Sequence, residues 1–404
     1  MIEQSQKEIL LSYYIVIDDV IGMAIFDLLV EASEKRGVKV KILVDALNTK
    51  ISKPVLAYLE EKGIEVRVFN PGSILRPLNY ARRLHDKLFL TDMKNLIIGG
   101  RNIKREYYSL GVDKNFLDRD VFVQGDFAVE KARSHFYGIW DNPLISKKKK
   151  TIKLTDADRK KIANRLAEAS ILLQHTKGIY LRTKNNWAKG QPQTANPVNF
   201  EHDNFFVKNK FGKIVYGDVK ISGSTKGLIK LIEKARRCIW IENAYVIPTR
   251  KWYKALDDAL KRGVKIRVLT NSMQTNDVVI AQAAYMNARC KLVKMGIEVW
   301  EYQGPKTLHI KSAVIDDSIS IVSSYNLDAL AERWSTEVAA WVVDTTLALQ
   351  HKAIMDSHLK NAVLVGPDNV PLFGDHNNYK PYPFCSRLKL WCYRHTIAWT
   401  LKLF

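Results

Sequence analysis

Residues 84–102 read LHDKLFLTDMKNLIIGGRN, and residues 308–326 read LHIKSAVIDDSISIVSSYN. The two stretches share four residue types at identical spacing: His85, Lys87, Asp92 and Asn102 match His309, Lys311, Asp316 and Asn326. A single His-x-Lys pair carries little information in a lysine-rich chain, but two complete sets in register are not expected by chance. The repeat therefore predicts a chain built from two related halves.

Both stretches have the pattern of a strand. Apolar residues alternate through them, as at Leu84, Leu88 and Leu90. Residues two apart on a strand point to the same face, so each histidine projects beside its lysine. A second short apolar run follows and ends in a pair of small residues, Gly99-Gly100 or Ser323-Ser324. Small residues at this point let the backbone approach a bound group closely.

The residue types in the repeat suit the chemistry of a phosphodiester. If the two copies meet, they bring together two imidazoles, two ammonium groups and two amides. One neutral histidine can attack phosphorus while the other protonates the departing oxygen. The lysines would hold the non-bridging oxygens together with a phosphate-binding set formed by Asn102, Asn326, Gly100 and Ser324. No metal-ligand spacing accompanies the repeat, so we expect neither a metal nor another cofactor.

The sequence around the motifs is repeated as well. Each half carries RGVK before one strand-like run, at 36–44 and 262–270, and GIEV before another, at 63–69 and 296–302. Helix-like segments alternate with these runs, which predicts an α/β fold with a mixed sheet flanked by helices in each half. The predicted boundaries are a first half at 1–145, a linker with a helical insertion at 146–212, a second half at 213–375 and a C-terminal segment at 376–404.

The two halves differ at their beginnings. GLIKLIEKARR precedes the first strand of the second half, whereas little sequence precedes the first strand of the first half. We therefore expect either an upstream start or the lack of an element that packs beside that strand. The sequence shows no signal peptide and no apolar run of the roughly eighteen residues needed to span a bilayer.

The composition indicates a basic protein with room for two cores. The chain has 404 residues, of which 47% are hydrophobic, and a formal net charge of +21. This charge predicts a polyanionic partner, either nucleic acid or an anionic membrane surface, although basic residues can also serve solubility alone. The four cysteines lack metal-binding or framework spacing, so we expect unpaired thiols and a reducing compartment.

The pattern H-x-K-x4-D followed by G-(G/S)-x-N resembles the phospholipase D superfamily, here as a two-copy, single-chain member. Stretches such as RGVKVKILVD, IEVRVFNP and SSYNLD are similar to bacterial cardiolipin synthases, most of all to the cardiolipin synthase C subgroup. The resemblance implies two similar halves related by a pseudo-twofold axis, with the active site at their interface. It also implies His85 as the nucleophile and His309 as the general acid, with the carboxylates of Asp120 and Glu337 orienting the histidines.

The resemblance thus yields a predicted catalytic set of His85, Lys87, Asp92, His309, Lys311 and Asp316. We expect the two aspartates, which follow strands, to support the site rather than perform chemistry. The second copy departs from the family pattern at Ser323, Leu330 and Ala331. These departures bear on headgroup preference more than on the core reaction.

The resemblance implies phosphatidyl transfer, in which a phospholipid donates its phosphatidyl group and phosphatidylglycerol accepts it, giving cardiolipin. Water as the acceptor would make the protein a phospholipase D. A nuclease and a non-catalytic membrane-binding protein are further alternatives, although the subgroup-specific segments make nucleic acid an unlikely partner. The expected partners are anionic or zwitterionic phospholipids and a membrane surface, with a peripheral location on the bacterial inner (cytoplasmic) membrane.

Residues 384–404 read FCSRLKLWCYRHTIAWTLKLF and mix aromatic rings with cations without any acid. This composition is typical of an interfacial helix in the headgroup layer. The alternative is a terminal helix that packs against the body of the protein.

Deletion of residues 384–404 should weaken association with anionic vesicles, because the segment would supply both apolar insertion and headgroup attraction. Co-sedimentation with vesicles measures the effect, with zwitterionic vesicles as the comparison. Equal sedimentation of the full-length and shortened chains would contradict an interfacial helix.

Overall fold

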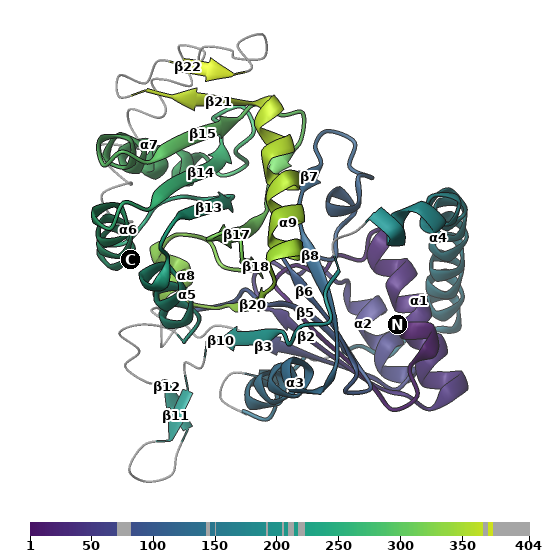
Figure 1. The fold of residues 1–404 in the computed structure, drawn as a ribbon. Coiled ribbons are helices and arrows are strands. Elements are labelled where there is room, and N and C mark those ends of the chain that lie inside the picture. The colour runs from purple at the N-terminus through teal and green to yellow at the C-terminus, as the bar shows by residue number, and fades with distance from the viewer. Residues whose placement is uncertain are drawn as a thin grey trace. The chain divides into compact units, whose positions relative to one another are not determined.

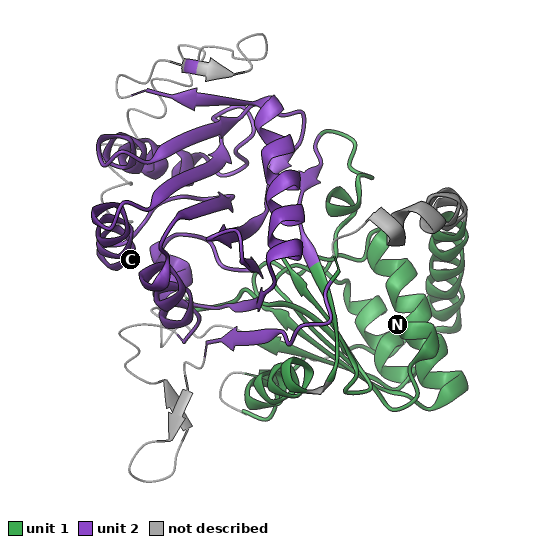
Figure 2. Cartoon of the chain, viewed as in Figure 1, with its two compact units in different colours: residues 1–113, 121–193 green, residues 114–120, 194–404 purple. Residues whose placement is uncertain are grey.

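A computed structural model describes residues 1–70, 82–142, 146–149, 151–190, 193–203, 206–208, 214–216, 223–366 and 371–374 (Figure 1). The segment 384–404 lies outside these residues. The chain forms two compact units (Figure 2): residues 1–113 and 121–193 make unit 1, and residues 114–120 and 194–404 make unit 2. The short segment 114–120 thus belongs to the unit that carries the second motif copy, and the predicted linker 146–212 is divided between the units.

Unit 1 is built on a seven-stranded mixed sheet. β1, β2 and β3 run parallel to one another, and β5, β6 and β9 pair antiparallel with their neighbours. In spatial order the strands are β8 (Asp120–Gln124), β6 (Asn95–Gly99), β5 (Lys87–Thr91), β1 (Glu8–Tyr13), β2 (Lys39–Asp45), β3 (Ile64–Phe69) and β9 (Ser146–Lys148).

Helices cover both faces of this sheet. α1 (Val20–Arg36), α2 (Lys53–Glu61) and α4 (Asp156–Gly190) share one hydrophobic core with β1, β2 and β3. On β3, Arg67 alternates with core residues and stacks on Trp140 of α3 (Asp126–Trp140), 4.4 Å from the ring centroid. This contact places α3 on the opposite face. The shorter elements of unit 1 are η1 (Ile2–Gln4), β4 (Arg83–Leu84) and η3 (Arg105–Tyr108).

Unit 2 is built on a nine-stranded mixed sheet. Its strands in spatial order are β10 (Asn199–His202), β20 (Val338–Val343), β18 (Ile319–Ser323), β17 (Lys311–Ile315), β13 (Cys238–Asn243), β14 (Lys265–Asn271), β15 (Glu298–Tyr302), β21 (Ala362–Val365) and β22 (Pro371–Gly374). The remaining short elements are β7 (Phe116–Leu117), β11 (Phe206–Lys208), β12 (Ile214–Tyr216), β16 (Thr307–Leu308), α8 (Ala329–Arg333), β19 (Ser335–Thr336) and η4 (Leu359–Asn361).

The helices of unit 2 are also distributed over two faces. α5 (Gly223–Lys234), α6 (Arg250–Lys261) and α7 (Val279–Lys294) form one core with β13, β14 and β15. α9 (Thr345–His358) lies across β17 and β18 on the other face (Figure 1). There Val314 of β17 packs with Ala348 and Met355 of α9 beside Trp240.

The two sheets share their central topology. The order β5-β1-β2-β3 in unit 1 corresponds to β17-β13-β14-β15 in unit 2, with the same parallel and antiparallel pairings. The predicted α/β class with a mixed sheet in each half is therefore confirmed. α4 packs on α1 in unit 1, and α5 packs on α6 in unit 2. In unit 1, a helix from later in the chain therefore takes the place that in unit 2 belongs to the helix before the first central strand.

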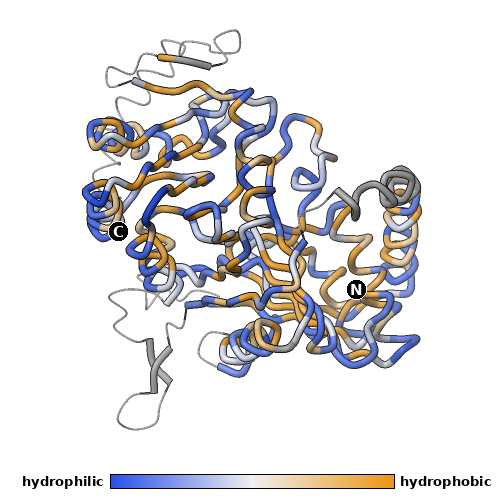
Figure 3. Tube along the Cα trace, in the orientation of Figure 1, coloured by the Kyte–Doolittle hydropathy of each residue, from blue (hydrophilic) through white to orange (hydrophobic). Residues whose placement is uncertain are grey.

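Hydrophobic residues concentrate along the central strands and the helix faces that cover them (Figure 3). Within the described part of the chain, no helix combines the length and the apolar character needed to cross a membrane. Cys238 is buried and Cys290 half-buried, and the two form no disulfide with a described cysteine.

Substitution of Gly22 by alanine should lower the free energy of unfolding by about 2 kcal/mol or more, because the added methyl group has no room. A Cβ at Gly22 would lie 1.8 Å from the carbonyl oxygen of Ile17. Thermal or urea unfolding measures the change.

The matched control is Gly138→Ala in α3, where an added Cβ meets nothing within 4 Å. Because alanine has the better helix propensity, this variant should be unchanged or up to about 1 kcal/mol more stable. Equal stability of the two variants would contradict the packing described for α1.

Candidate active site

In unit 2, the second motif copy buries a histidine and a lysine side by side. His309 lies between β16 and β17, Lys311 begins β17, and their side chains are almost fully enclosed. The ammonium nitrogen of Lys311 donates to the backbone carbonyl of His309 at 2.5 Å and lies 2.8 Å from Nδ1 of its ring. His309 thus precedes the strand that the sequence predicts for it, and its ring nevertheless lies beside the ammonium group of Lys311.

Asp118 holds the His309 ring from the other side. Its Oδ2 lies 2.7 Å from Nδ1 of His309, and both side chains are buried. A proton on Nδ1 that points to this carboxylate leaves Nε2 as the nitrogen that exchanges protons with a ligand. Asp118 reaches this place because β7 pairs in parallel with β16, so that the N–H of His309 donates to the carbonyl of Leu117 at 2.7 Å.

Burial and neighbouring charges set the protonation of this pair. Burial, followed by the positive charge of Lys311, lowers the pKa of His309, and Asp118 opposes this shift. Burial lowers the pKa of Lys311 to about 8, and the carboxylates of Asp118 and Glu337 oppose that change. Lys311 is therefore still mostly a cation at neutral pH, which suits it to hold an anionic phosphate oxygen.

Other predicted residues of the second copy lie near the end of β18. The hydroxyl of Ser324 donates to Glu337 at 2.5 Å, and the backbone N–H of Ser324 donates to Val338. The Oδ1 atom of Asn326 is buried, and among the described residues it has no hydrogen-bond partner. The amide of Asn326 therefore retains capacity to bind a ligand.

In unit 1, the first copy repeats the histidine–lysine arrangement. Lys87 is buried at the start of β5 and donates to the carbonyl of His85 at 2.8 Å. Tyr14 meets the His85 ring edge to face, with 4.8 Å between centroids. The intervening Asp86 points the other way and contacts Nε2 of His135 on α3 at 2.8 Å, which makes His135 a structural histidine.

The phosphate-binding residues predicted for the first copy have different surroundings. Gly100 follows β6 and is buried. The amide of Asn102 accepts from the N–H of Ile15 at 3.1 Å and donates to the hydroxyl of Tyr107 at 2.8 Å. Asn102 thus holds loops of unit 1 together, whereas Asn326 does not use its Oδ1 in this way.

The motif aspartates lie at the far ends of their strands. Asp92 and Asp316 stand in the turns after β5 and β17, each with a positive φ angle. At about 3.4 Å per residue, five residues separate Asp92 from Lys87 by about 17 Å. Asp92 accepts hydrogen bonds at the start of β1, and Asp316 does the same at the start of β13. Both carboxylates therefore brace the sheet rather than the reacting groups, in line with a supporting role.

The family resemblance implies Asp120 as an orienting carboxylate, whereas the carboxylate in contact with His309 is that of Asp118. The stretch FLDRDV offers two acids two residues apart, and only the pairing of β7 with β16 distinguishes them. Asp120 begins β8, and its predicted orienting role stays a prediction, as does that of Glu337. Tyr14 was also missed, because nothing in its sequence context marks it.

Comparison with known proteins identifies the family of this chain. The family described as cardiolipin synthase, PLD-like domain, matches residues 1–140 and 228–359. The chain belongs to this family. It is thus a phospholipase D-type phosphatidyltransferase, and the resemblance seen in the motifs is confirmed.

Individual relatives extend over most of the chain. Cardiolipin synthase C of Escherichia coli is 29% identical over 388 residues, which cover 86% of this chain and 78% of that protein. The major cardiolipin synthase ClsA of Bacillus subtilis is 28% identical and covers 86% of this chain and 63% of its own length. Among solved structures, the phosphatidylserine synthase of Haemophilus influenzae matches the fold with a TM-score of 0.65 at 16% identity, covering 99% of this chain and 91% of that one.

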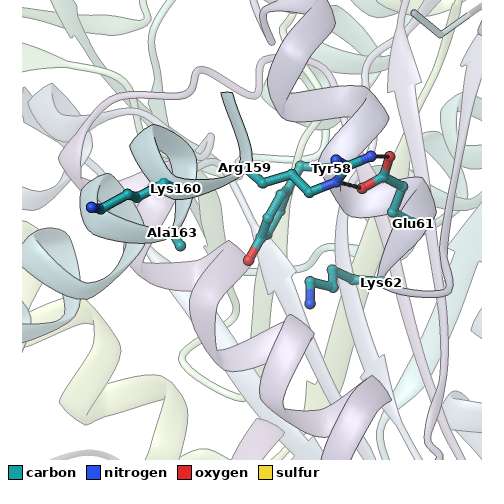
Figure 4. Close-up of a pocket in the computed structure, with 6 residues that line it drawn as sticks. All are labelled: Tyr58, Glu61, Lys62, Arg159, Lys160 and Ala163. Carbon is teal, nitrogen blue, oxygen red and sulfur yellow. Dashed lines mark hydrogen bonds and ion pairs between the residues drawn. The ribbon is translucent and has the colours of Figure 1, made fainter. Parts of the chain in front are cut away.

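An open hollow of about 400 Å³ lies between α2 and α4 of unit 1 (Figure 4). Arg159 of α4 crosses it to form two hydrogen bonds with Glu61, which lines the side of α2 together with Tyr58 and Lys62. None of its lining residues belongs to a motif, and the carboxylate already pairs the arginine. The hollow is therefore a feature of helix packing in this phospholipase D-like protein and not part of the predicted site.

Substitution of Asp92 by asparagine should lower the free energy of unfolding by about 1–2 kcal/mol near neutral pH, because a charged acceptor of several hydrogen bonds is lost. Asparagine tolerates the positive φ of 52° at this position, so the turn itself is retained. Denaturant unfolding of the wild type and the variant measures the difference.

The pH dependence of that difference has a definite sign. Partial burial opposes ionisation of Asp92, but the N–H groups of Lys7 and Gln6 and the hydroxyl of Ser5 outweigh it and lower its pKa. The stabilisation is therefore fully present above the unfolded-state pKa of about 3.9 and disappears as the pH falls through the lower folded-state value. A gap between the two proteins that persists in strong acid would contradict this role.

Proposed function

We propose that this protein transfers the phosphatidyl group of a phospholipid to an alcohol through a phosphohistidine on His85. The acceptor is the headgroup of phosphatidylglycerol, and the product is cardiolipin. The observation that carries the proposal is the buried histidine–lysine pair in each unit, with Asp118 on Nδ1 of His309. The names of the relatives, cardiolipin synthases from two bacteria, support the choice of product.

The first step forms the covalent intermediate. A ring nitrogen of His85 attacks phosphorus, the bond between phosphorus and the headgroup oxygen breaks, and that oxygen takes a proton from His309. Lys87 and Lys311 stabilise the negative charge on the non-bridging oxygens. This step requires that the two histidines act on the same phosphorus atom, and we propose that they do.

The second step reverses the proton transfer. His309, now neutral, takes the proton of the acceptor hydroxyl as its oxygen attacks phosphorus, and the bond to His85 breaks. Burial lowers the pKa of His309, which favours this neutral, proton-accepting form. In the first step, the negative charge of a bound phosphodiester raises the same pKa and supplies the acid form. One group can therefore serve both steps.

The substrates and location follow from the charge and the chemistry together. A net charge of +21 favours a surface of anionic phospholipids, where donor and acceptor both reside. We accordingly propose a peripheral association with the bacterial inner membrane. The alternative of a phospholipase D hydrolase differs only in the acceptor, because water can take the place of the alcohol in the second step.

A substrate series separates the roles of the two histidines. With defined phospholipids, His85→Ala should reduce turnover on the order of 10⁴-fold or more, because the nucleophile is lost. His309→Ala should also be inactive on natural lipids. On phosphatidyl-p-nitrophenol, however, it should release one equivalent of nitrophenol per protein, because that leaving group needs no proton.

Chromatography of the lipid products completes this test. Cardiolipin from phosphatidylglycerol alone supports the transferase, and phosphatidic acid as the main product supports the hydrolase. Full activity of His85→Ala would refute the nucleophile assignment, as would a nitrophenol burst in His85→Ala but not in His309→Ala.

A further inference from the structure

A polar cluster surrounds the buried carboxylate of Glu242, on the face of the unit 2 sheet that α9 covers. In the register of β13 with β17, Asn243 is opposite Lys311 and Glu242 is opposite Ser312. Because neighbours on a strand point to opposite faces, Glu242 and Ser312 point away from the face of Lys311. The Glu242 cluster consists of Arg119, Glu242, Ser312, Ser320, His351 and His358.

Arg119 is the centre of this cluster. Its Nη1 atom lies 2.7 Å from Oε2 of Glu242, 2.6 Å from Oγ of Ser312 and 2.6 Å from Nε2 of His351. The second oxygen of Glu242 meets Nδ1 of His358 at 2.6 Å. The guanidinium thus reaches strands β13 and β17 and helix α9 with a single nitrogen.

The protonation states of the cluster are suited to holding Arg119. Burial alone would raise the pKa of Glu242, but Arg119 and His358 outweigh it and hold that pKa at about 2. Burial and the charge of Arg119 lower the pKa of His351 to about 3. His351 is therefore neutral, and with Nδ1 bonded to the hydroxyl of Ser320 at 2.7 Å, its Nε2 can accept from the guanidinium.

Arg119 follows Asp118 directly in the chain. The backbone N–H of Arg119 donates to Oδ1 of Asp118 at 2.9 Å, while Oδ2 of Asp118 contacts His309. On the other side of Asp118, the pairing of β7 with β16 fixes Phe116 and Leu117. The carboxylate that holds His309 is thus anchored on both sides, once by the backbone pairing and once by the Arg119 side chain.

We propose that Arg119 is a positioning residue for the reaction: by anchoring segment 114–120 to the buried carboxylate of Glu242, it holds Asp118 against Nδ1 of His309. The effect of Arg119 on turnover rests on the proposed function, whereas its effect on the contact between Asp118 and His309 does not. Two consecutive residues, Asp118 and Arg119, thus connect His309 to the Glu242 cluster on the opposite face of the sheet.

The pKa of His309 gives a readout that plain destabilisation would not produce. The charged groups that act on His309 include Asp118, Lys311 and Asp277. Removal of the positive charge of Arg119 would by itself raise the pKa of His309. Loss of the Asp118 contact would lower it, so the sign of the change separates an anchor from a simple charge effect.

The experiment follows His309 by NMR titration in the full-length chain, assigned with His309→Gln, without any lipid. Arg119→Ala should lower the pKa of His309 by about one unit or more, and Arg119→Lys should lower it less. A failure of the proposed function would leave this readout intact, because no turnover is needed.

The matched control is Arg289→Ala, which breaks another arginine–glutamate pair of unit 2 with a buried carboxylate, Arg289 with Glu301 at 2.6 Å. This variant should leave the pKa of His309 unchanged. If Arg119→Ala does not fold, Glu242→Gln is measured by the same criterion. In a folded variant, an unchanged or raised pKa of His309 would overturn the proposal.

If the wild type transfers phosphatidyl groups as proposed, kcat should fall about 10²-fold in Arg119→Ala, since a small displacement of an orienting group is costly. KM should change less, because Arg119 is not expected to touch the substrate. A fall in kcat with the same pKa of His309 would assign Arg119 a structural role only and overturn the positioning role.

Discussion

A buried ammonium group beside a histidine, once in each unit, is the feature on which the rest of the protein depends. Lys87 and Lys311 are each only 1% exposed, and an ammonium group taken out of water is costly unless other groups compensate it. Each lysine donates to the carbonyl of its own histidine, and in unit 2 Asp118 and Glu337 add negative charge. Each ammonium group can therefore also bind an anionic phosphate oxygen.

In unit 2, the alternation of side chains along the strands places two groups of polar residues on opposite faces of the sheet. His309 and Lys311 occupy one face, and the Glu242 cluster occupies the other, covered by α9. The motif aspartates lie at the opposite end of their strand from the histidine–lysine pair. Asp92 and Asp316 accept hydrogen bonds from the first residue of the neighbouring strand and from the residue before it, so each motif also ties its own strand to the start of the next one.

Much of this could be predicted from the sequence because it rests on local geometry. The His-x-Lys spacing sets both side chains on one face, and the duplication forces a shared topology upon the two sheets. The contribution of segment 114–120 could not be predicted, because it depends on the pairing of β7 with β16 across nearly two hundred residues of chain. Nor could the strand pairing of residues 146–148 with β3, since a run of lysines has the composition of a solvated linker.

In the proposed reaction, two displacements at phosphorus, through His85, transfer the phosphatidyl group. The stereochemical course at a chiral phosphorus tests this most directly, since each displacement inverts the configuration. A phospholipid donor that carries sulfur and an oxygen isotope at phosphorus should yield a product with the original configuration. An inverted product would mean a single direct displacement and would contradict the account.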